Sequence, residues 1–404
     1  MSTKVLVVGA GPAGIACAVE LHRAGVKVVV IDKATFPRDK CCGDGLTTAA
    51  LRRLEMLGFD LGSVPSVNSC RDVKVHSPRH RTIDLRLPDE GLFAAIAPRR
   101  ELDSALVDHA RRMGIEIHEE SPLLLIDENG ADRVVATIEG RGTLQFDHVV
   151  AADGMWSPTR RMLGLQTDGY LGEWHAFRQY VGNVTGPAAR ELHVWFEEDL
   201  LPGYAWSFPL PGNRVNFGYG ILRETGRSTK HMNALWRDLF TRRHIVEALG
   251  DGFMPEERHT AWPIPARIDS AVRSSGRVHF VGDAVCATDI LTGEGIGQAL
   301  ETGTLAAQAI IEGRSAADVR ARYSRLLDSH FLADHRMSVV LGNLLAGPRT
   351  AETVLRLVDT NDWTRRNFAR WMFEDEPRAA ALTPRRWHRG FLSRPGAYDS
   401  HPPH

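Results

Sequence analysis

A glycine-rich segment between two apolar runs, close to the N-terminus, constrains the fold more than any other feature of this sequence. Val5–Val8 and Val28–Ile31 are continuous apolar runs of the kind expected of parallel strands buried on both faces. Between them, Gly9-Ala-Gly-Pro-Ala-Gly14 opens a helical pattern that ends at Gly25, a suitable C-cap. Strand, glycine turn, helix and second strand predict one βαβ unit of a Rossmann-type domain.

The same unit predicts dinucleotide binding. Gly9 permits the tight turn, Gly11 lets the backbone approach a pyrophosphate, and Gly14 lets helix and strand pack closely. Asp32 ends the second strand, where a carboxylate accepts hydrogen bonds from an adenosine ribose. The predicted nucleotide-binding residues are Gly9, Gly11, Pro12, Ala13, Gly14, Asp32 and Lys33. A tight turn in an unrelated α/β fold is the alternative, and the glycine pattern alone does not choose between NAD and FAD.

A second strand-to-helix turn carries another glycine-aspartate pair. Val278–Val281 is predicted as a strand that opens into Gly282-Asp283, and Gly293 and Gly295 precede a helix with one packed face that begins at Ile296. The N-terminus of that helix presents a positive dipole end, which can stabilise negative charge on a reduced flavin. The aspartate of the pair would accept hydrogen bonds from ribityl hydroxyls. An ordinary strand-to-helix turn with a capping acid is the alternative.

Both motifs, together with a predicted strand at Phe146–Ala152 that runs into Asp153-Gly154, resemble FAD-dependent oxidoreductases built like para-hydroxybenzoate hydroxylase. In that group the first glycine fingerprint binds the ADP part of FAD, and the second Gly-Asp pair binds the ribityl chain. The resemblance therefore implies FAD as the cofactor.

Two segments narrow the resemblance to the geranylgeranyl reductase family. Phe36–Leu46 looks like the segment that members carry after the second strand, and Tyr204–Pro209 followed by Gly218-Tyr-Gly220 is similar to their aromatic signature. Arg99, in the pattern Arg-x-x-Leu-Asp, matches an arginine that contacts FAD in this family; a solvent-facing arginine at a helix start is the alternative. The FAD contacts implied beyond the first fingerprint are Arg38, Cys42, Gly43, Arg99, Asp153, Gly282, Asp283, Gly293, Gly295 and Ile296.

The aromatic segment also has a physical interpretation of its own. Tyr204, Trp206 and Phe208 alternate along a strand and so share one face, and Pro211–Asn213 is predicted as the turn of a hairpin. Three rings on one sheet face can wall an apolar cavity beside a flavin, or they can fill the core of the sheet. The resemblance favours the cavity wall. The predicted substrate contacts are Tyr204, Trp206, Phe208, Pro209, Gly218 and Gly220.

The sequence departs from the family pattern at three positions. Members often have proline where Cys41 and Ile290 stand here, and glutamate is more usual where Asp32 stands. The loop that contains Ile290 approaches the flavin ring in the family, so this change bears on ring geometry and oxygen handling.

The leading functional hypothesis is reduction of carbon–carbon double bonds of an isoprenoid or other apolar substrate by hydride transfer from flavin N5. Cys42 is the predicted proton donor or site-shaping residue, because its loop faces the flavin ring in the family; a small buried thiol is the alternative. A vicinal disulfide between Cys41 and Cys42 is disfavoured because such rings are strained.

Two other classes of function stay open. A flavin monooxygenase or halogenase would act on an aromatic or polyketide-like molecule; a halogenase needs a lysine between flavin and substrate, for which Lys74 is placed best. A non-enzymatic flavoprotein would need a filled pocket beside the ring. No second nucleotide fingerprint is present, so NAD(P)H would dock transiently, or ferredoxin or another protein carrier would deliver the electrons.

Composition excludes several classes of protein. Among 404 residues, 49 basic side chains balance 50 acidic ones, which argues against nucleic-acid binding. Five cysteines, few and odd in number, argue against a disulfide framework and favour a reducing compartment. No apolar run approaches the ~18–20 residues of a spanning helix. We therefore predict a cytoplasmic protein, and no motif predicts a metal site or fixes the oligomeric state.

The predicted fold class is α/β, with a discontinuous FAD-binding domain interleaved with an antiparallel-sheet substrate domain. The FAD domain is assigned to 1–65, 95–165 and 265–315, the substrate sheet to 66–94 and 166–264, and a helical cap and tail to 316–404. Arginines are interspersed with aromatic residues between Trp363 and Arg394. This segment is predicted as a packed helical cap, with a lid or a peripheral membrane contact as alternatives.

Overall fold

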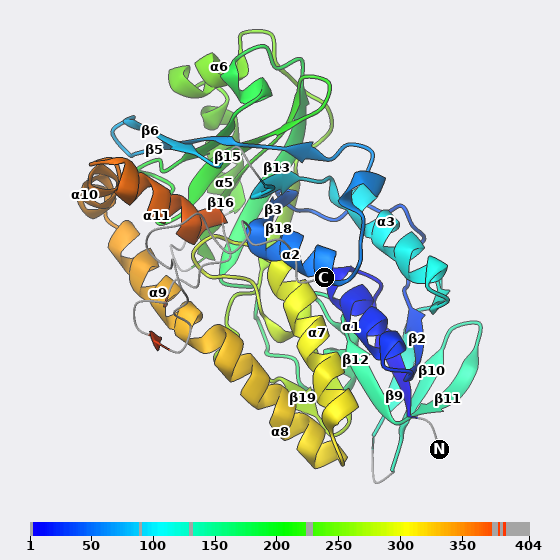
Figure 1. Ribbon diagram of the computed structural model, residues 1–404. Helices are drawn as coiled ribbons and strands as arrows, with labels where there is room; N and C mark the ends of the chain where they lie inside the picture. The colour runs from blue at the N-terminus through cyan, green and yellow to red at the C-terminus, as the bar shows by residue number, and fades with distance from the viewer. Residues whose placement is uncertain are drawn as a thin grey trace.

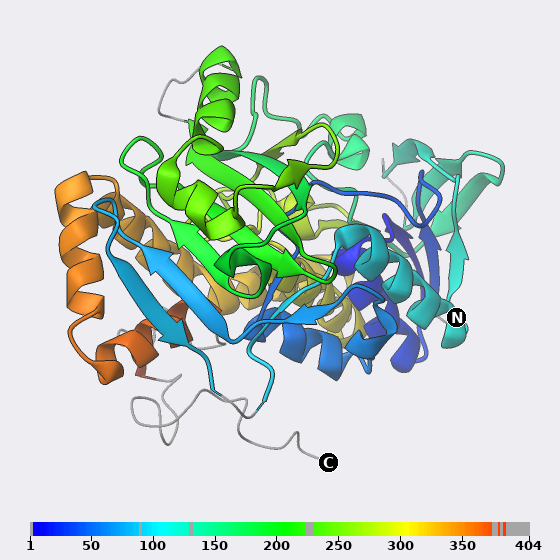
Figure 2. The same ribbon diagram turned by 90° about the horizontal axis from the view of Figure 1, so that it is seen from above.

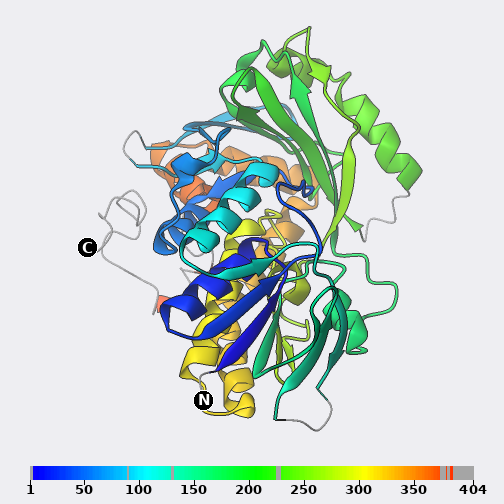
Figure 3. The ribbon, with the colours of Figure 1, turned by 90° about the vertical axis from the view of Figure 1, so that its right-hand side faces the viewer.

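The apolar runs of the N-terminal unit form the middle of a largely parallel sheet (Figures 1 and 3). The computed structural model describes residues 3–88, 91–128, 132–223, 229–373, 379 and 383–384. The sheet has the order β19-β20-β12-β1-β2-β8, and only β19 and β20 pair antiparallel. Its strands are β1 (Lys4–Val8), β2 (Lys27–Ile31), β8 (Glu116–His118), β12 (His148–Ala151), β19 (Ser274–Ser275) and β20 (Val278–Phe280). β1 is central because its apolar side chains are buried on both faces.

Two long helices bring the two glycine motifs together. α1 (Pro12–Arg23) follows β1, α7 (Ile296–Glu312) comes after β20, and the two helices pack against each other (Figure 1). Small residues permit this approach, since a Cβ on Gly303 would lie 2.1 Å from the carbonyl oxygen of Ala13. Both helices begin beyond the carboxyl ends of parallel strands, so their N-termini lie at the same edge of the sheet.

A second sheet, mostly antiparallel, lies above the parallel sheet in the view of Figure 3. Its order is β17-β13-β16-β15-β14-β5-β6, β18 pairs with β13, and β14 and β5 are parallel. Its strands are β5 (Asp72–His76), β6 (Thr82–Arg86), β13 (Trp174–Gly182), β14 (Leu192–Trp195), β15 (Tyr204–Leu210), β16 (Arg214–Leu222), β17 (Met254–Pro255) and β18 (Thr260–Ile264). The predicted hairpin joins β15 to β16, with Gly212 and Asn213 at φ of 76° and 56°.

Two three-stranded sheets and the remaining helices complete the fold. The strand orders are β3-β7-β4 and β11-β10-β9. These strands are β3 (Gly45–Thr47), β4 (Asn68–Ser69), β7 (Ala94–Ile96), β9 (Leu123–Asp127), β10 (Val134–Ile138) and β11 (Gly142–Phe146). The helices are α2 (Thr48–Met56), α3 (Arg99–Arg112), α4 (Pro158–Met162), α5 (Thr229–Leu239), α6 (Arg243–Leu249), α8 (Ala316–Leu327), α9 (Ala333–Leu345), α10 (Pro348–Val358) and α11 (Asp362–Phe373).

Of the C-terminal helices, α8 packs on α7, whereas α11 packs beside β6 of the mostly antiparallel sheet (Figure 2). Of the predicted Arg- and Trp-rich segment, α11 is described, whereas 374–378, 380–382 and 385–404 lie outside the described residues. Within the described ranges, no helix has both the length and the apolar character needed to cross a bilayer.

The predicted fold class is confirmed, because a parallel sheet with packed helices, a larger antiparallel sheet and a helical C-terminal region are all present. The predicted single strand at Phe146–Ala152 is wrong. β11 ends at Phe146, and β12 begins at His148 in a different sheet. Asp147 separates them, and its carboxylate accepts a hydrogen bond from the backbone N–H of Lys4 (2.7 Å). The predicted domain boundaries stay a proposal.

Two buried histidines on neighbouring strands make the parallel sheet sensitive to acid. His148 Nδ1 and His279 Nε2 lie 3.1 Å apart, and burial lowers the pKa of His148 to about 4 and that of His279 to about 3. In the unfolded chain both imidazoles take up a proton at a pH of about 6.5, whereas in the folded protein they stay neutral until the pH is near 3–4. Stability is therefore lost as the pH falls from about 6.5 towards 3–4. We expect His279→Leu to make the slope of unfolding free energy, measured with urea between pH 4 and 6.5, shallower by about 1.4 kcal/mol per pH unit. An unchanged slope would contradict this explanation.

Candidate functional site

A cavity of about 650 Å³ is lined by residues of both large sheets. It brings together predicted residues from every motif. Those on its lining are Gly9, Gly11, Pro12, Ala13, Asp32, Lys33, Arg38, Cys42, Gly43, Arg99, Asp153, Tyr204, Trp206, Phe208, Gly220, Gly282, Asp283, Gly293, Gly295 and Ile296. Gly14, Pro209 and Gly218 do not line it.

The first glycine motif shapes one end of the cavity. Gly9 has φ of 107°, and a Cβ there would lie 2.3 Å from the Ala152 carbonyl oxygen. A Cβ on Gly14 would lie 1.9 Å from the carbonyl oxygen of Gly9, so this glycine permits close packing behind the lining. Among the described residues no side chain caps the N-terminus of α1, which leaves its first N–H groups available to a phosphate.

The carboxylates that follow β2 and β12 differ in how many of their oxygens accept a hydrogen bond. Asp32 accepts hydrogen bonds from the backbone N–H groups of Ala10 (2.8 Å) and Ala34 (2.9 Å), which fix its orientation. Asp153 Oδ2 accepts from the N–H of Thr159 (2.9 Å), but its buried Oδ1 has no partner among the described residues. Burial raises the pKa of Asp153. A buried, unpartnered oxygen on the lining is a polar position for a bound group.

Two arginines at the cavity share one acid. The Nε and Nη2 atoms of Arg99 lie 2.7 and 2.8 Å from the two carboxylate oxygens of Asp103, and Arg38 Nη1 lies 3.0 Å from the second. Arg99 is buried, so the alternative of a solvent-facing arginine is wrong. Two guanidinium groups against one carboxylate leave a net positive charge, which suits an anionic group in the cavity.

The second glycine motif forms another part of the lining. α7 begins at Ile296 after Gly295, and its N-terminus has no side-chain cap from the part of the chain that the structure describes. Asp283 Oδ2 pairs with Lys40 Nζ at 3.3 Å, and the Lys40 ammonium lies 4.0 Å from the ring centroid of Trp262. Ile290 lies in the loop between Asp283 and the start of α7. Its carbonyl oxygen accepts a hydrogen bond from Trp174 Nε1 (2.9 Å).

The aromatic segment lines the cavity through Tyr204, Trp206 and Phe208, which alternate along β15. The ring centroids of Tyr204 and Trp206 are 6.0 Å apart, and those of Trp206 and Phe208 are 6.1 Å apart. Trp206 Nε1 donates to Asn216 Oδ1 (3.1 Å), which satisfies the buried indole N–H. A Cβ on Gly43 would lie 3.4 Å from the Phe208 ring, so the wall packs directly on the loop that carries Cys42.

Gly218 supports the wall from the neighbouring strand. A Cβ at this position would lie 2.3 Å from Trp206 Cζ2 and 2.5 Å from the Phe177 carbonyl oxygen, whereas a Cβ on Gly220 would lie 3.6 Å from its nearest neighbour, the Trp174 ring. We expect Gly218→Ala to displace Trp206 and to lower the unfolding free energy by about 1–3 kcal/mol. Gly220→Ala is the matched control and should cost less than about 1 kcal/mol in the same urea titration. Equal stability of the two variants would rule out this packing role.

Cys42 lines the same cavity as the wall and lies beside a polar cluster that the sequence did not reveal. The N–H of Asp44 donates to Cys42 Sγ (3.4 Å), and burial raises the pKa of the thiol. The fully buried carboxylate of Asp44 accepts hydrogen bonds from Tyr180 Oη (2.7 Å), Asn216 Nδ2 (2.8 Å) and the N–H of Arg99 (3.1 Å). Burial raises the pKa of Asp44, although these donors oppose the shift. Burial, rather than the hydrogen bonds of this cluster, raises the pKa of the thiol, because the charge of Arg99 and the hydrogen bond from the Asp44 N–H both act to lower it.

Arg178 and Asn216 fix the backbone of the Cys42 loop. Arg178 Nε and Asn216 Nδ2 donate to the Cys42 carbonyl oxygen (3.1 and 2.9 Å), and Arg178 Nη2 pairs with Asp39 (2.8 Å). Both side chains are buried on strands that are otherwise largely apolar. A charged or amide residue inside such a strand was the signal that could have identified them.

Two other predicted residues have clear environments. Cys41 and Cys42 are both free thiols, and Cys41 Sγ accepts a hydrogen bond from Thr260 Oγ1 (3.3 Å). Lys74 does not line the cavity; it pairs with Asp84 and lies 3.8 Å from Glu191. It therefore does not occupy the position that a halogenase lysine requires.

Known proteins resemble this chain along most of its length. A model of the FAD binding domain family matches residues 2–323. Menaquinone reductase from Mycolicibacterium smegmatis is 31% identical over 86% of each chain. Digeranylgeranylglycerophospholipid reductase from Methanosarcina acetivorans is 27% identical over 78% of this chain and 76% of the relative. The solved structure of a geranylgeranyl bacteriochlorophyll reductase-like protein from Thermoplasma acidophilum has a TM-score of 0.77 at 20% identity, covering 95% of this chain and 100% of that chain.

The fold alone does not separate reductases from halogenases, because the flavin-dependent halogenase CmlS also shares it (TM-score 0.68, 24% identity, 99% of this chain and 74% of that chain). The family match and the reductase relatives nevertheless confirm two predictions, the FAD cofactor and the oxidoreductase class. The chain belongs to the FAD binding domain family and, within it, to the geranylgeranyl reductase family of FAD-dependent oxidoreductases.

Proposed function

We propose that the protein reduces carbon–carbon double bonds of an isoprenoid or another apolar molecule. The observation that carries this proposal is the juxtaposition of the aromatic wall with Cys42 in the same cavity that the FAD motifs line. The names of two relatives, menaquinone reductase and digeranylgeranylglycerophospholipid reductase, support an apolar lipid as substrate.

The residues on the lining fit FAD. Gly9, Gly11 and the uncapped start of α1 suit the pyrophosphate, and the fixed carboxylate of Asp32 suits the adenosine ribose. Asp153 offers an unpartnered buried oxygen, and the uncapped N-terminus of α7 suits the negative charge of a reduced ring. The remaining proposed FAD contacts are Pro12, Ala13, Lys33, Arg38, Cys42, Gly43, Arg99, Gly282, Asp283, Gly293, Gly295 and Ile296.

When bound and reduced, FAD supplies a hydride to one carbon of the double bond. The chain's own residues supply the rest. Tyr204, Trp206 and Phe208 hold the alkene in an apolar slot and exclude water. Cys42 gives its proton to the second carbon, and the raised pKa of its thiol keeps that proton in place at neutral pH. Arg178 and Asn216 hold the loop in position for this transfer.

Product analysis under strict anaerobiosis tests the proposal. The holoenzyme, reduced with dithionite, is incubated with geranylgeranyl diphosphate or a menaquinone, and mass spectrometry should show a gain of two hydrogens per reduced bond. No gain on any isoprenoid tried counts against the proposal. A substrate-dependent consumption of oxygen, with no anaerobic turnover, would instead indicate a monooxygenase or halogenase. Bleaching of the bound flavin by NAD(P)H, or only by reduced ferredoxin, identifies the electron donor.

A peripheral membrane contact through the C-terminal helices extends the proposal. Met372 of α11 lines the cavity, and Trp363 and Trp371 of the same helix are exposed. Indole rings are favourable at a bilayer interface, so α11 is placed to receive a lipid substrate from the membrane surface. We expect the full chain to float with anionic liposomes and a Trp363→Ser, Trp371→Ser double variant to float several-fold less. Equal flotation removes this part of the proposal.

A further inference from the structure

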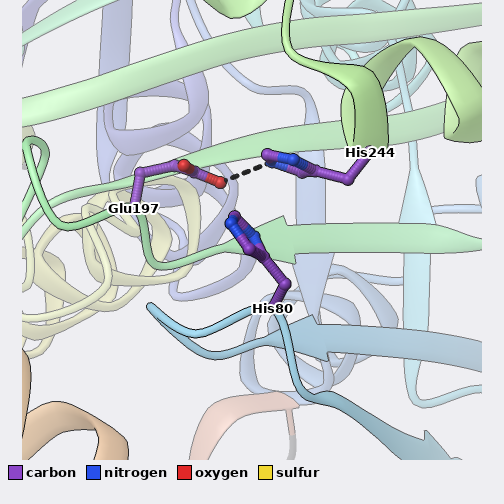
Figure 4. Close-up of side chains that lie close together, drawn as sticks. All are labelled: His80, Glu197 and His244. Atoms are coloured by element: carbon purple, nitrogen blue, oxygen red, sulfur yellow. Dashed lines mark hydrogen bonds and ion pairs between the residues drawn. The ribbon is translucent and has the colours of Figure 1, made fainter.

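Three side chains that commonly bind metals converge outside the cavity lining (Figure 4). His80 lies in the turn between β5 and β6, Glu197 follows β14, and His244 lies in the first turn of α6. One nitrogen or oxygen atom from each lies within 4.8 Å of the others. Glu197 Oε1 and His244 Nε2 are 2.7 Å apart, and the ring centroids of His80 and His244 are 4.3 Å apart.

The residue types select a class of ion. Two imidazoles and one carboxylate are a typical ligand set for Zn²⁺, whereas Mg²⁺ and Ca²⁺ prefer oxygen ligands. Bonds of about 2.0–2.2 Å in a tetrahedral sphere place the ligand atoms about 3.3 Å apart. The observed separations therefore need only small side-chain rotations, which the exposed ring of His80 can make.

The turn fixes the backbone that carries His80. The N–H of His80 donates to the Ser77 carbonyl oxygen (2.8 Å), and the N–H of Ser77 donates to the Arg81 carbonyl oxygen (2.9 Å). His76, the nearest other histidine of this hairpin, already contacts His193 and Thr82 through its two ring nitrogens (2.9 and 3.1 Å). Solvent would therefore complete the coordination sphere.

The surrounding charges favour a dication. Arg242 pairs with Glu197, and it also pairs with Asp199 and Asp238, each at 2.7 Å. Counting Glu197 itself, three carboxylates against one guanidinium leave a formal charge of about −2 at this cluster.

We propose that His80, Glu197 and His244 bind one Zn²⁺ ion, which ties the β5–β6 turn to the loop after β14 and to α6. The three residues come from separate parts of the chain, so the ion would act as a cross-link between them. This site is independent of the proposed reductase activity.

Zinc binding by the tag-free, EDTA-dialysed holoenzyme tests the proposal. Calorimetric titration with ZnCl₂ should show one site per chain, and the thermal unfolding temperature should rise with zinc but not with MgCl₂ or CaCl₂. His80→Ala and His244→Ala should each weaken the zinc affinity at least about tenfold, or about 1.4 kcal/mol. His80 is exposed, so its substitution removes a ligand without disturbing the core.

His22→Ala, on α1, is the matched histidine control because the chain has 17 histidines that can hold zinc weakly. This variant should bind zinc like the natural chain. The proposal is overturned if zinc binding is unaffected by His80→Ala, or if His22→Ala weakens it equally, because either result means nonspecific binding to scattered histidines.

Discussion

Gly11→Val is expected to give a folded but colourless protein. Gly11 has φ of −76° and ψ of −177°, which a branched residue adopts without strain, so the fold should persist. A Cβ there meets only Arg38 Nη2, at 3.6 Å, and the added methyl groups would extend into the cavity at the start of α1. FAD affinity should fall at least about 100-fold, or about 2.8 kcal/mol. The measurement is flavin fluorescence during reconstitution of the apoprotein.

Gly342→Val on α9 is the matched control, because a Cβ at Gly342 has no neighbour within 4 Å among the described residues. It should purify yellow with a full complement of flavin. If Gly11→Val retains flavin as well as this control does, the glycine motif does not hold the pyrophosphate, and the proposed orientation of FAD is wrong.

The second large effect concerns Cys42. Removing a proton donor from its place beside the substrate typically costs a factor of about 10²–10⁴ in rate. We therefore expect Cys42→Ala to lower the steady-state rate of double-bond reduction at least about 100-fold. Flavin binding is measured separately, because Cys42 is also a proposed FAD contact, and it should fall far less than the rate. Mass spectrometry of the product and anaerobic flavin absorbance separate these steps.

Cys41→Ala provides the neighbouring control. Cys41 also lines the cavity, but its sulfur is engaged by Thr260 rather than by the Asp44 loop. Its loss should change the rate by only a few fold. If both variants lose the reduction rate to a similar extent, the two thiols act by maintaining the shape of the loop. Cys42 then has no special role in proton transfer.

The nucleotide half of the site was predictable because one local unit forms it. Gly9, Gly14 and Asp32 all belong to the strand–helix–strand segment, where spacing alone places them. The aromatic wall was predictable for a similar reason, since alternation on β15 puts Trp206 and Phe208 on one face. Pro209 falls on the opposite face, and Gly218 lies behind Trp206 rather than in the cavity.

The polar cluster around Cys42 was not predictable from local pattern. Asp44 meets Tyr180 and Asn216, which lie 136 and 172 residues further along the chain. The residue pattern within one strand does not determine its register with a neighbouring strand, and it is this register that brings such residues together. The local signal in the sequence is that Arg178 and Asn216 are polar residues within largely apolar strands, where a buried polar side chain needs a hydrogen-bond partner.

The strand order of the parallel sheet also governs how the protein is made. β1 pairs with β12, and β12 in turn pairs with β20, whose residues follow after more than half of the chain has left the ribosome. β1 can pair with β2 and β12 early, but the far edge of β12 stays unpaired until β20 has been synthesised. Completion of this sheet should therefore be slow compared with the folding of a helical protein of the same length, because its strand pairs are distant in sequence.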